Sequence, residues 1–299
     1  MLHITVRQLE AFAAIARHGN LTAAAEALSL TKGALSQALQ QLENQLGTPL
    51  FDRVHPRLQL NSEGQQLQPM VEDALSRLTD IAYRFHPERA AQGVLRLGAS
   101  QTIGNYLLPA LLARLQREGN IRPDVRITNT HQLGDRLLNF ELDLALIEGE
   151  IRHPDIHSQH WREDEMVVVA APTHALATAT TLTVRDLSGQ AFVLREPNSG
   201  SRERFDHDLL PGLEHCGQLL QLNTLEAVMQ AIEQGLGLTL ISELAVADRL
   251  ASGRLIALPL TQRFPRELRL AWHRKKYHTR LMQRFIELCE PQTSATTDT

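Results

Sequence analysis

Residues 20–61 read NLTAAAEALSLTKGALSQALQQLENQLGTPLFDRVHPRLQLN, and this stretch predicts two short helices joined by a tight turn and followed by a small β-hairpin. Apolar residues recur at helical spacing on both sides of a polar break at residues 29–32. Thr31 stands where a hydroxyl would cap the second helix, which we expect to run from Lys32 to Leu46. This order is typical of a winged helix-turn-helix, so DNA binding is the first hypothesis for residues 1–61.

The second helix carries a polar face of short and amide-bearing side chains, which suit base edges or phosphates in a major groove. An ordinary solvent-exposed helix face is the alternative interpretation. The hairpin adds two arginines that could grip phosphate. The predicted DNA contacts are Lys32, Gly33, Ser36, Gln37, Gln40, Arg53 and Arg57.

The charge of this head is low for a DNA-binding module. Residues 1–61 contain five basic side chains against four acidic ones. Phosphate attraction alone would therefore be weak, and affinity would have to depend on dimerisation and geometry.

A long helix is predicted to follow, from a capping box of Ser62 and Gln65 to about Phe85, before Pro87 ends it. Its apolar residues alternate at spacings of four and three, which is the pattern of a heptad seam. That seam predicts a dimerising linker helix, with residues 62–92 as linker and hinge, whereas a helix lying on its own domain is the alternative. The seam residues are Leu67, Val71, Ala74, Leu78, Ile81 and Phe85.

The motifs RQLEAFAAIARHGNLTAAAEAL at residues 7–28 and ALSQALQQLENQLGTPLFDR at residues 34–53 resemble the amino-terminal domain of LysR-type transcriptional regulators. The resemblance covers about the first ninety residues. It implies a regulator that binds promoter DNA as a dimer or a dimer of dimers and responds to a small-molecule inducer, with RNA polymerase as a further partner. Family members usually have Gln and then Pro or Ser where this chain has Lys32 and Gly33, so a different operator sequence is expected.

From Gly93 onward, strand-like runs alternate with helical ones, which predicts an α/β domain with largely parallel sheets. Two lobes fit better than one, with lobe I at about residues 93–163 and 268–291 and lobe II at about 164–267. The layout is similar to the periplasmic-binding-protein-like effector domain of the LysR family. Residues 292–299 are expected to be a disordered tail.

Small ligands usually bind at strand carboxyl ends and between lobes in such folds. Helix starts with free amides, together with Arg202, would favour an anion there, although plain helix caps are the alternative for each hydroxyl. Glu148 would repel an anion unless it is paired, or it could grip an amino group. The predicted ligand residues are Ser100, Gln101, Thr102, Thr130, Glu148, Ser199, Ser201, Arg202 and Thr224.

Three motifs in this domain are SQTIGNYLLP at residues 100–109, LIEGE at 146–150 and NSGSRE at 198–203. They resemble the YeiE- and CysL-like branch of the family, which is associated with sulfite. The resemblance implies a small oxyanion such as sulfite as inducer, and an amino acid or carboxylate is the alternative.

No catalytic motif is present, so the chain is not predicted to be an enzyme. It lacks a nucleophile elbow, HExxH, a P-loop and a cysteine cluster, and no cofactor is expected. His153, His157 and His160 have helical spacing, but Pro154 favours a loop, so no metal site is predicted. A solute-binding α/β protein without a DNA role would leave the heptad seam unexplained.

The whole-chain charge of −4 argues against a membrane-surface role. There is no signal segment and no apolar run of membrane-spanning length, so a cytoplasmic protein is expected. The basic run from Arg263 to Arg284 is interpreted as a solvated surface.

Overall fold

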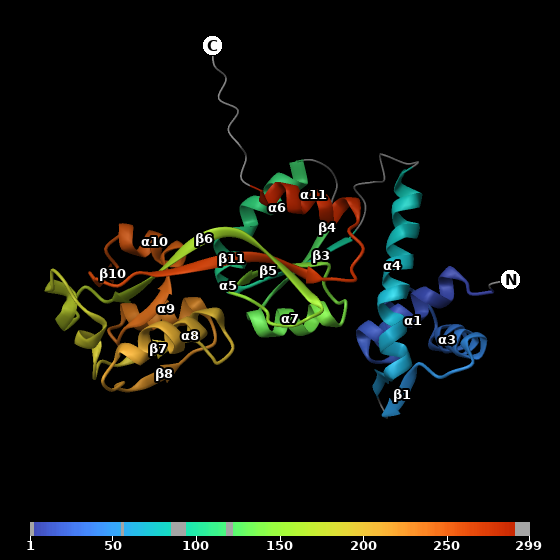
Figure 1. Ribbon diagram of the computed structural model, residues 1–299, viewed down its shortest axis with the longest axis horizontal. Helices are drawn as coiled ribbons and strands as arrows, with labels where there is room; N and C mark the ends of the chain where they lie inside the picture. Colours follow the sequence, from blue (N-terminus) through green and yellow to red (C-terminus); the bar gives the residue numbers. More distant parts are fainter. Residues whose placement is uncertain (1–2, 55–56, 85–93, 118–121, 291–299) are drawn as a thin grey trace, which may run out of the picture.

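The computed structural model describes residues 3–54, 57–84, 94–117 and 122–290 (Figure 1). The amino-terminal head, as we call residues 3–54 and 57–60, holds three helices and a two-stranded antiparallel wing. Its elements are α1 (Val6–His18), α2 (Leu21–Ala27), α3 (Lys32–Leu46), β1 (Phe51–Val54) and β2 (Arg57–Leu60). The predicted bounds of α3 are confirmed, and the Thr31 side chain accepts from the amide of Ala34 at 3.2 Å.

The head has its own apolar core. Ala24 and Ala25 are buried, and their small side chains let α2 cross α1 and α3 closely. Phe12 of α1 is fully buried and lies 5.5 Å from the ring of Phe51, which joins the wing to this core. The shared core therefore packs α1, α2, α3 and the wing against one another.

Helix α4 (Ser62–Arg84) follows the wing directly. The predicted capping box is wrong, because Asn61 is the capping residue and its side chain accepts from the amide of Gly64 at 2.9 Å. Leu67 and Val71 pack on the core of the head, whereas Leu78 and Ile81 are 41% and 57% exposed. The first half of the seam thus covers its own domain, and the second half is open to a partner. Phe85 lies outside the described residues.

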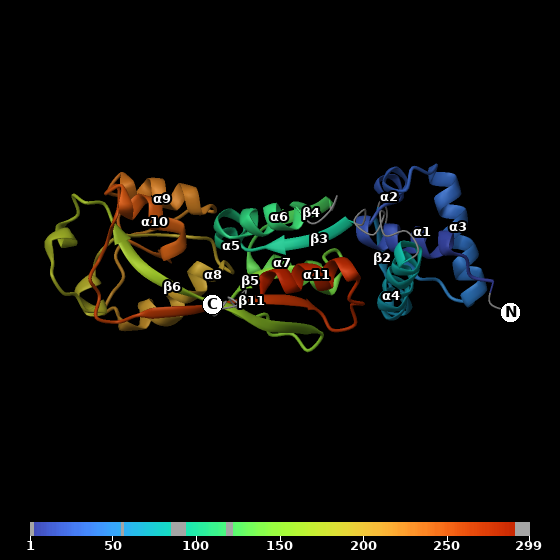
Figure 2. The same cartoon turned by 90° about the horizontal axis from the view of Figure 1, so that it is seen from above.

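The remainder of the chain forms two lobes joined by two long strands (Figures 1 and 2). Lobe I comprises β3 (Val94–Ala99), α5 (Gln101–Tyr106), α6 (Leu108–Arg117), β4 (Arg122–Ile127), α7 (Thr130–Leu138), β5 (Leu144–Glu148) and α11 (Arg280–Cys289). Lobe II comprises η2 (Ala175–Thr178), η3 (Val184–Leu187), β7 (Phe192–Leu194), α8 (Gly200–Arg204), η4 (Phe205–Leu209), η5 (Leu210–Gly212), β8 (Leu219–Gln221), α9 (Leu225–Glu233), β9 (Thr239–Ser242), α10 (Glu243–Ala251) and β10 (Ile256–Ala257). The joining strands are β6 (Ile156–Ala170) and β11 (Phe264–His273).

The large sheet is mixed, so the expectation of largely parallel sheets is wrong. Strand β3 pairs in parallel with β4 and β5, but β11 is antiparallel to both β5 and β6, and β6 is antiparallel to β9 and β10. The physical reason is the chain path: β6 leaves lobe I and β11 returns to it, so the two strands must run in opposite directions where they pair. Their ladder shifts register between Leu268 and Arg269.

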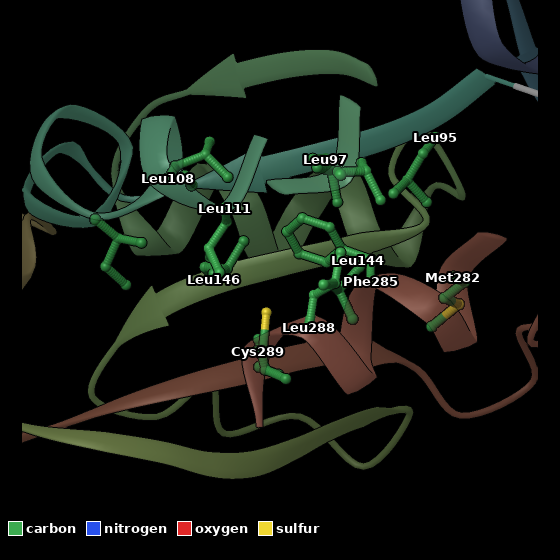
Figure 3. Packing of buried hydrophobic residues seen from close by; sticks show 14 of the residues in the cluster. Leu95, Leu97, Leu108, Leu111, Leu144, Leu146, Met282, Phe285, Leu288 and Cys289 are labelled. Atoms are coloured by element: carbon green, nitrogen blue, oxygen red, sulfur yellow. The ribbon is translucent and has the colours of Figure 1, made fainter. Parts of the chain in front are cut away.

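Helices cover both faces of the sheet in lobe I. Helices α6 and α11 lie on one face and α7 lies on the other (Figure 1). Figure 3 shows Phe285 and Leu288 of α11 beside Leu144 of β5. This packing positions the carboxyl ends of β3 and β5, where the predicted ligand residues begin.

Phe285→Ala should lower the free energy of unfolding by about 3–5 kcal/mol, because it removes a fully buried ring from this core. Urea denaturation followed by circular dichroism measures the change. Gln283→Ala, on the exposed side of the same helix, should change stability by less than about 0.5 kcal/mol. Equal effects of the two substitutions would show that the packing of α11 is misassigned.

Candidate functional site

The amino-terminal half of α3 presents a continuous polar surface. Its apolar side, Leu35, Ala38, Leu39 and Leu42, is buried in the head. The predicted DNA contacts on this helix, Lys32, Gly33, Ser36, Gln37 and Gln40, are all exposed. A β-carbon built on Gly33 would meet nothing within 4 Å, so the start of the helix is open to an approaching backbone.

The wing lies beside this surface. The backbone places Arg53 of β1 opposite Leu58 and Arg57 of β2 opposite Val54. The amide of Leu58 donates to the carbonyl of Gly19 at 2.9 Å, which ties the wing to the turn before α2. Both predicted wing arginines are thus adjacent to the tip of a hairpin held at a fixed place on the head, while residues 55 and 56 lie outside the described residues.

Between the lobes, the carboxylate of Glu148 is the central group. Glu148 ends β5 and is 4% exposed, and its Oε1 accepts from the amide of Thr102 at 3.2 Å. The Thr130 hydroxyl donates to the Glu148 carbonyl oxygen at 3.3 Å. On the lobe II side, a β-carbon built on Gly200 would lie 2.6 Å from Oε2 of Glu148, so only glycine allows α8 to approach this closely.

Arg266 of β11 binds Glu148 to a second buried carboxylate. Its Nη1 donates to Oε2 of Glu148 at 2.6 Å, and its Nε donates to Oδ2 of Asp164 at 3.0 Å. Ser242, at the end of β9, donates to the other oxygen of Asp164 at 2.9 Å. Side-chain exposure is 1% for Arg266 and Asp164 and 4% for Glu148. The network therefore runs through both joining strands and contacts both lobes.

The net negative charge of this site follows from the same groups. Burial acts to raise the pKa of Glu148, but the Arg266 guanidinium and the Thr102 and Ser100 groups outweigh it, so the pKa of Glu148 is lowered and the carboxylate is ionised. Burial raises the pKa of Glu203 on α8, and the nearby charge of Glu148 adds to that effect. One guanidinium thus faces two buried carboxylates, with Glu203 beside them.

Two buried hydroxyls at this site have no hydrogen-bond partner among the described residues. Ser100 and Thr102 are 3% and 1% exposed, and both approach the Glu148 carboxylate without reaching hydrogen-bond geometry. Burying a hydroxyl without a partner is costly, and such groups frequently mark a binding site. Gln101 lies between them and contacts lobe II, where its Oε1 accepts from the amide of Leu225 at 3.0 Å.

The other predicted ligand residues have local partners. Ser199 caps α8 by accepting from the amide of Arg202 at 3.3 Å, and Ser201, two residues later, is buried. The guanidinium of Arg202 binds Asp206, in the adjoining element η4, at 2.8 Å, so it pairs within its own segment and not with the predicted anion position. Thr224 is exposed and caps α9 through the amide of Ala227. For Ser199 and Thr224 the alternative interpretation as helix caps thus describes the observed contacts.

The assignment of the basic run at residues 263–284 to a solvated surface is wrong at two positions. Arg266 is 3% exposed between the lobes, and Lys276 is 6% exposed beside Glu72, near the middle of α4. The signal was available, because inward and outward residues alternate along β11 and Arg266 falls on the same side as Phe264 and Leu268.

Within the described residues, no group of three or more His, Cys, Asp and Glu side chains is arranged to hold a metal ion. His157 and His160 lie on strand β6, where the helical spacing of the histidines does not apply. None of the described helices combines the length and the apolar character that a membrane span needs.

Comparisons with known proteins agree with this architecture. The family model for the bacterial regulatory helix-turn-helix protein, lysR family, matches residues 6–65, and the model for the LysR substrate binding domain matches residues 88–294. The chain therefore belongs to the LysR family, and it is a DNA-binding transcriptional regulator with an effector-binding domain.

Individual relatives extend over nearly the whole chain. The HTH-type transcriptional regulator YeiE of Escherichia coli is 38% identical over 296 residues, which cover 97% of this chain and 98% of that protein. CysL of Bacillus subtilis is 31% identical over 239 residues, 78% of this chain and 79% of its own. A full-length OxyR variant from Pseudomonas aeruginosa has the same fold, with a TM-score of 0.77 at 22% identity, covering 97% and 94% of the two chains.

Glu148→Gln should flatten the acid side of the stability profile. Because folding lowers the pKa of Glu148 from its ordinary 4.5, its contribution is complete above about pH 4.5 and is lost as the pH falls through the folded-state pKa. At pH 7 the substitution should cost about 3 kcal/mol, since it leaves Arg266 with one carboxylate fewer. Urea midpoints between pH 7 and pH 3.5 measure both effects. A profile parallel to that of the unsubstituted protein would contradict the assignment, and the exposed Glu150→Gln serves as control.

Proposed function

We propose that this regulator binds a two-fold-related promoter site as a dimer or a dimer of dimers, with α3 in the major groove and the wing on phosphates. The exposed polar face of α3 is the observation behind this proposal. It presents one cation, Lys32, and the side-chain amides of Gln37 and Gln40, which can bind phosphates and base edges in a major groove. The open half of the α4 seam, including Leu78 and Ile81, supports pairing between chains.

The functional units we propose are residues 1–61 for DNA reading, 62–92 for linkage and pairing, and 93–291 for effector binding. Contact with RNA polymerase at the promoter and a cytoplasmic location form part of the same proposal. Both are in keeping with a protein that acts on chromosomal DNA.

We further propose that the inducer binds between the lobes, at Ser100, Thr102 and Glu148. The two partnerless hydroxyls support this, because a ligand would supply the hydrogen bonds that they lack. Glu148 touches Gly200 of lobe II, so a ligand that moves this carboxylate would also change the contact between the lobes.

Two ligand classes each have a supporting observation. A small oxyanion such as sulfite would take the place of the Glu148 carboxylate, between the amide of Thr102 and the guanidinium of Arg266. A ligand with an amino group would instead pair with Glu148, where carboxylates outnumber the one guanidinium. The first class is our main proposal and the second is the alternative.

Lys32→Ala should lower operator affinity about tenfold and reduce the slope of log affinity against log salt by about one, because one phosphate contact is lost. Gln37→Ala should weaken discrimination between operator variants by about 1–3 kcal/mol. Both are measured by fluorescence anisotropy on an operator selected in vitro from random DNA. Arg185→Ala, an exposed cation in lobe II, is the matched control, and losses no larger than its own would exclude α3 as the reading helix.

Glu148→Gln should distinguish the two ligand classes. Thermal shifts of the full chain are titrated with sulfite, sulfate, thiosulfate, phosphate, and small amino and carboxylic acids, since a bound ligand stabilises the folded state. Removing the competing carboxylate should raise oxyanion affinity about tenfold and lower the affinity for an amino-group ligand by a similar factor. Unchanged affinity for the stabilising ligand would remove Glu148 from the site, and Glu150→Gln controls for charge.

A further inference from the structure

A second cluster of buried charges lies at the junction between the amino-terminal head and lobe I. Its centre is Glu72 of α4, which is 5% exposed. Oε1 of Glu72 binds Nη2 of Arg17 from α1 at 3.0 Å, and Oε2 lies 3.6 Å from Nη2 of Arg96 and 3.8 Å from Nζ of Lys276. Glu72 therefore holds one cation of the head and two cations of lobe I.

The two lobe I cations of this cluster also share a carboxylate of their own. Asp143 binds Nζ of Lys276 at 2.8 Å and Nη2 of Arg96 at 2.9 Å, and its Oδ2 accepts from the Arg96 amide at 2.8 Å. Burial acts to raise the pKa of Asp143, but the two cations outweigh it and hold the pKa at about 2. Arg96 and Lys276 therefore keep Asp143 as a partner when the head, with Glu72, moves away from lobe I.

Arg17 differs, because Glu72 is its only ion-pair partner among the described residues. Burial lowers the pKa of Arg17, and repulsion from Arg96 lowers it further. When the head lies on lobe I, the Arg17 guanidinium is therefore held near the positive charge of Arg96. Glu72 gives the larger compensation for that repulsion, and Asp143 adds to it. Three cations face two carboxylates in the cluster, and neutralising Glu72 would leave one carboxylate among three cations.

Further contacts across the junction, within the part of the chain that the structure describes, involve polar or charged side chains. Gln68 of α4 donates to the carbonyl of Asn139 at 2.9 Å, and the guanidinium of Arg77 lies 4.7 Å above the ring of Tyr277. Beside the cluster, a cavity of about 980 Å³ opens between the two parts, lined by side chains that include His18, Asn20, Glu141 and Lys275. Apolar packing therefore does not fill this part of the junction.

Buried ion pairs give a defined geometry with little net stabilisation, because the charges regain their hydration when they separate. Polar interfaces within a chain accordingly permit relative motion of the parts. Here each part also has a separate apolar core, so separation would expose charges without exposing a core.

We propose that Glu72 is the centre of an ionic latch that holds the amino-terminal head in one orientation on lobe I of its own chain, and that opening this latch frees the head to reorient. The latch sets the angle from which α3 is presented to DNA. It acts whatever the inducer is, because none of its residues belongs to the site between the lobes.

The orientation can be measured by pulsed electron spin resonance between nitroxide labels at Glu10→Cys in α1 and Glu287→Cys in α11, both exposed positions. Cys216→Ser removes the accessible thiol, and buried Cys289, whose pKa is raised to about 12, does not react under native conditions. Labelled chains are diluted into unlabelled protein, so that each oligomer carries one labelled chain.

The labelled protein with Glu72 and Lys276 intact should give one narrow distribution of the distance between the two labels. Glu72→Gln should at least double its width. Lys276→Gln, which removes a partner of Glu72 on the lobe I side of the junction, should also widen it, and this keeps the test valid if the first variant fails to fold. Glu63→Gln, an exposed change of the same kind on the same helix, should leave the distribution unchanged. Narrow distributions in both latch variants would overturn the proposal.

In vitro selection from random DNA tests the consequence for operator choice. Full-length protein should select half-sites at one fixed spacing, whereas Glu72→Gln should accept a wider range of spacings. Loss of all selection by the unsubstituted protein would count against the DNA-reading assignment itself. Identical spacings from the two proteins would count against the latch alone.

Discussion

The pairing of Arg266 with Glu148 and Asp164 is the interaction on which the arrangement of the effector domain depends. Its carboxylates come from β5 and β6, its guanidinium comes from β11, and Gly200 of lobe II packs against the result. Because all three charges are nearly excluded from water, none can be left without a partner. The network therefore makes the contact between the two lobes depend on the charge of Glu148.

The fold of the head was largely readable from the sequence because its signals are local. Thr31 caps α3 as expected, and the small residues Ala24 and Ala25 mark the helix crossing. The start of α4 was assigned to the wrong residue, since Asn61 and Ser62 are both good caps and only the structure shows which side chain is used. Strand direction was misjudged as well, because pairing of β6 with β11 joins residues about a hundred positions apart.

The interlobe site was predicted in part. Ser100, Thr102, Thr130 and Glu148 meet as expected, because each follows a strand end of lobe I. Arg202 was assigned as the anion clamp by its position in a helix start, but Asp206 one turn later competes for it. Arg266 was hidden among surface cations, and its partners can be recognised only when β11 is placed between β5 and β6. Long-range pairing, which spacing along the chain cannot show, separates the contacts that could be predicted from those that could not.

Strands β6 and β11 pair from Ile156 to Met166 and from Phe264 to His273, with one shift of register between Leu268 and Arg269. A ladder of backbone hydrogen bonds resists stretching and sliding, but a two-stranded ribbon twists readily. Motion between the lobes is therefore directed into torsion about the ribbon. In an assembly of several chains, a twist in each effector domain would add up as rotation of the arms that carry the heads. What changes in such a regulator would then be the angle between its DNA-binding heads.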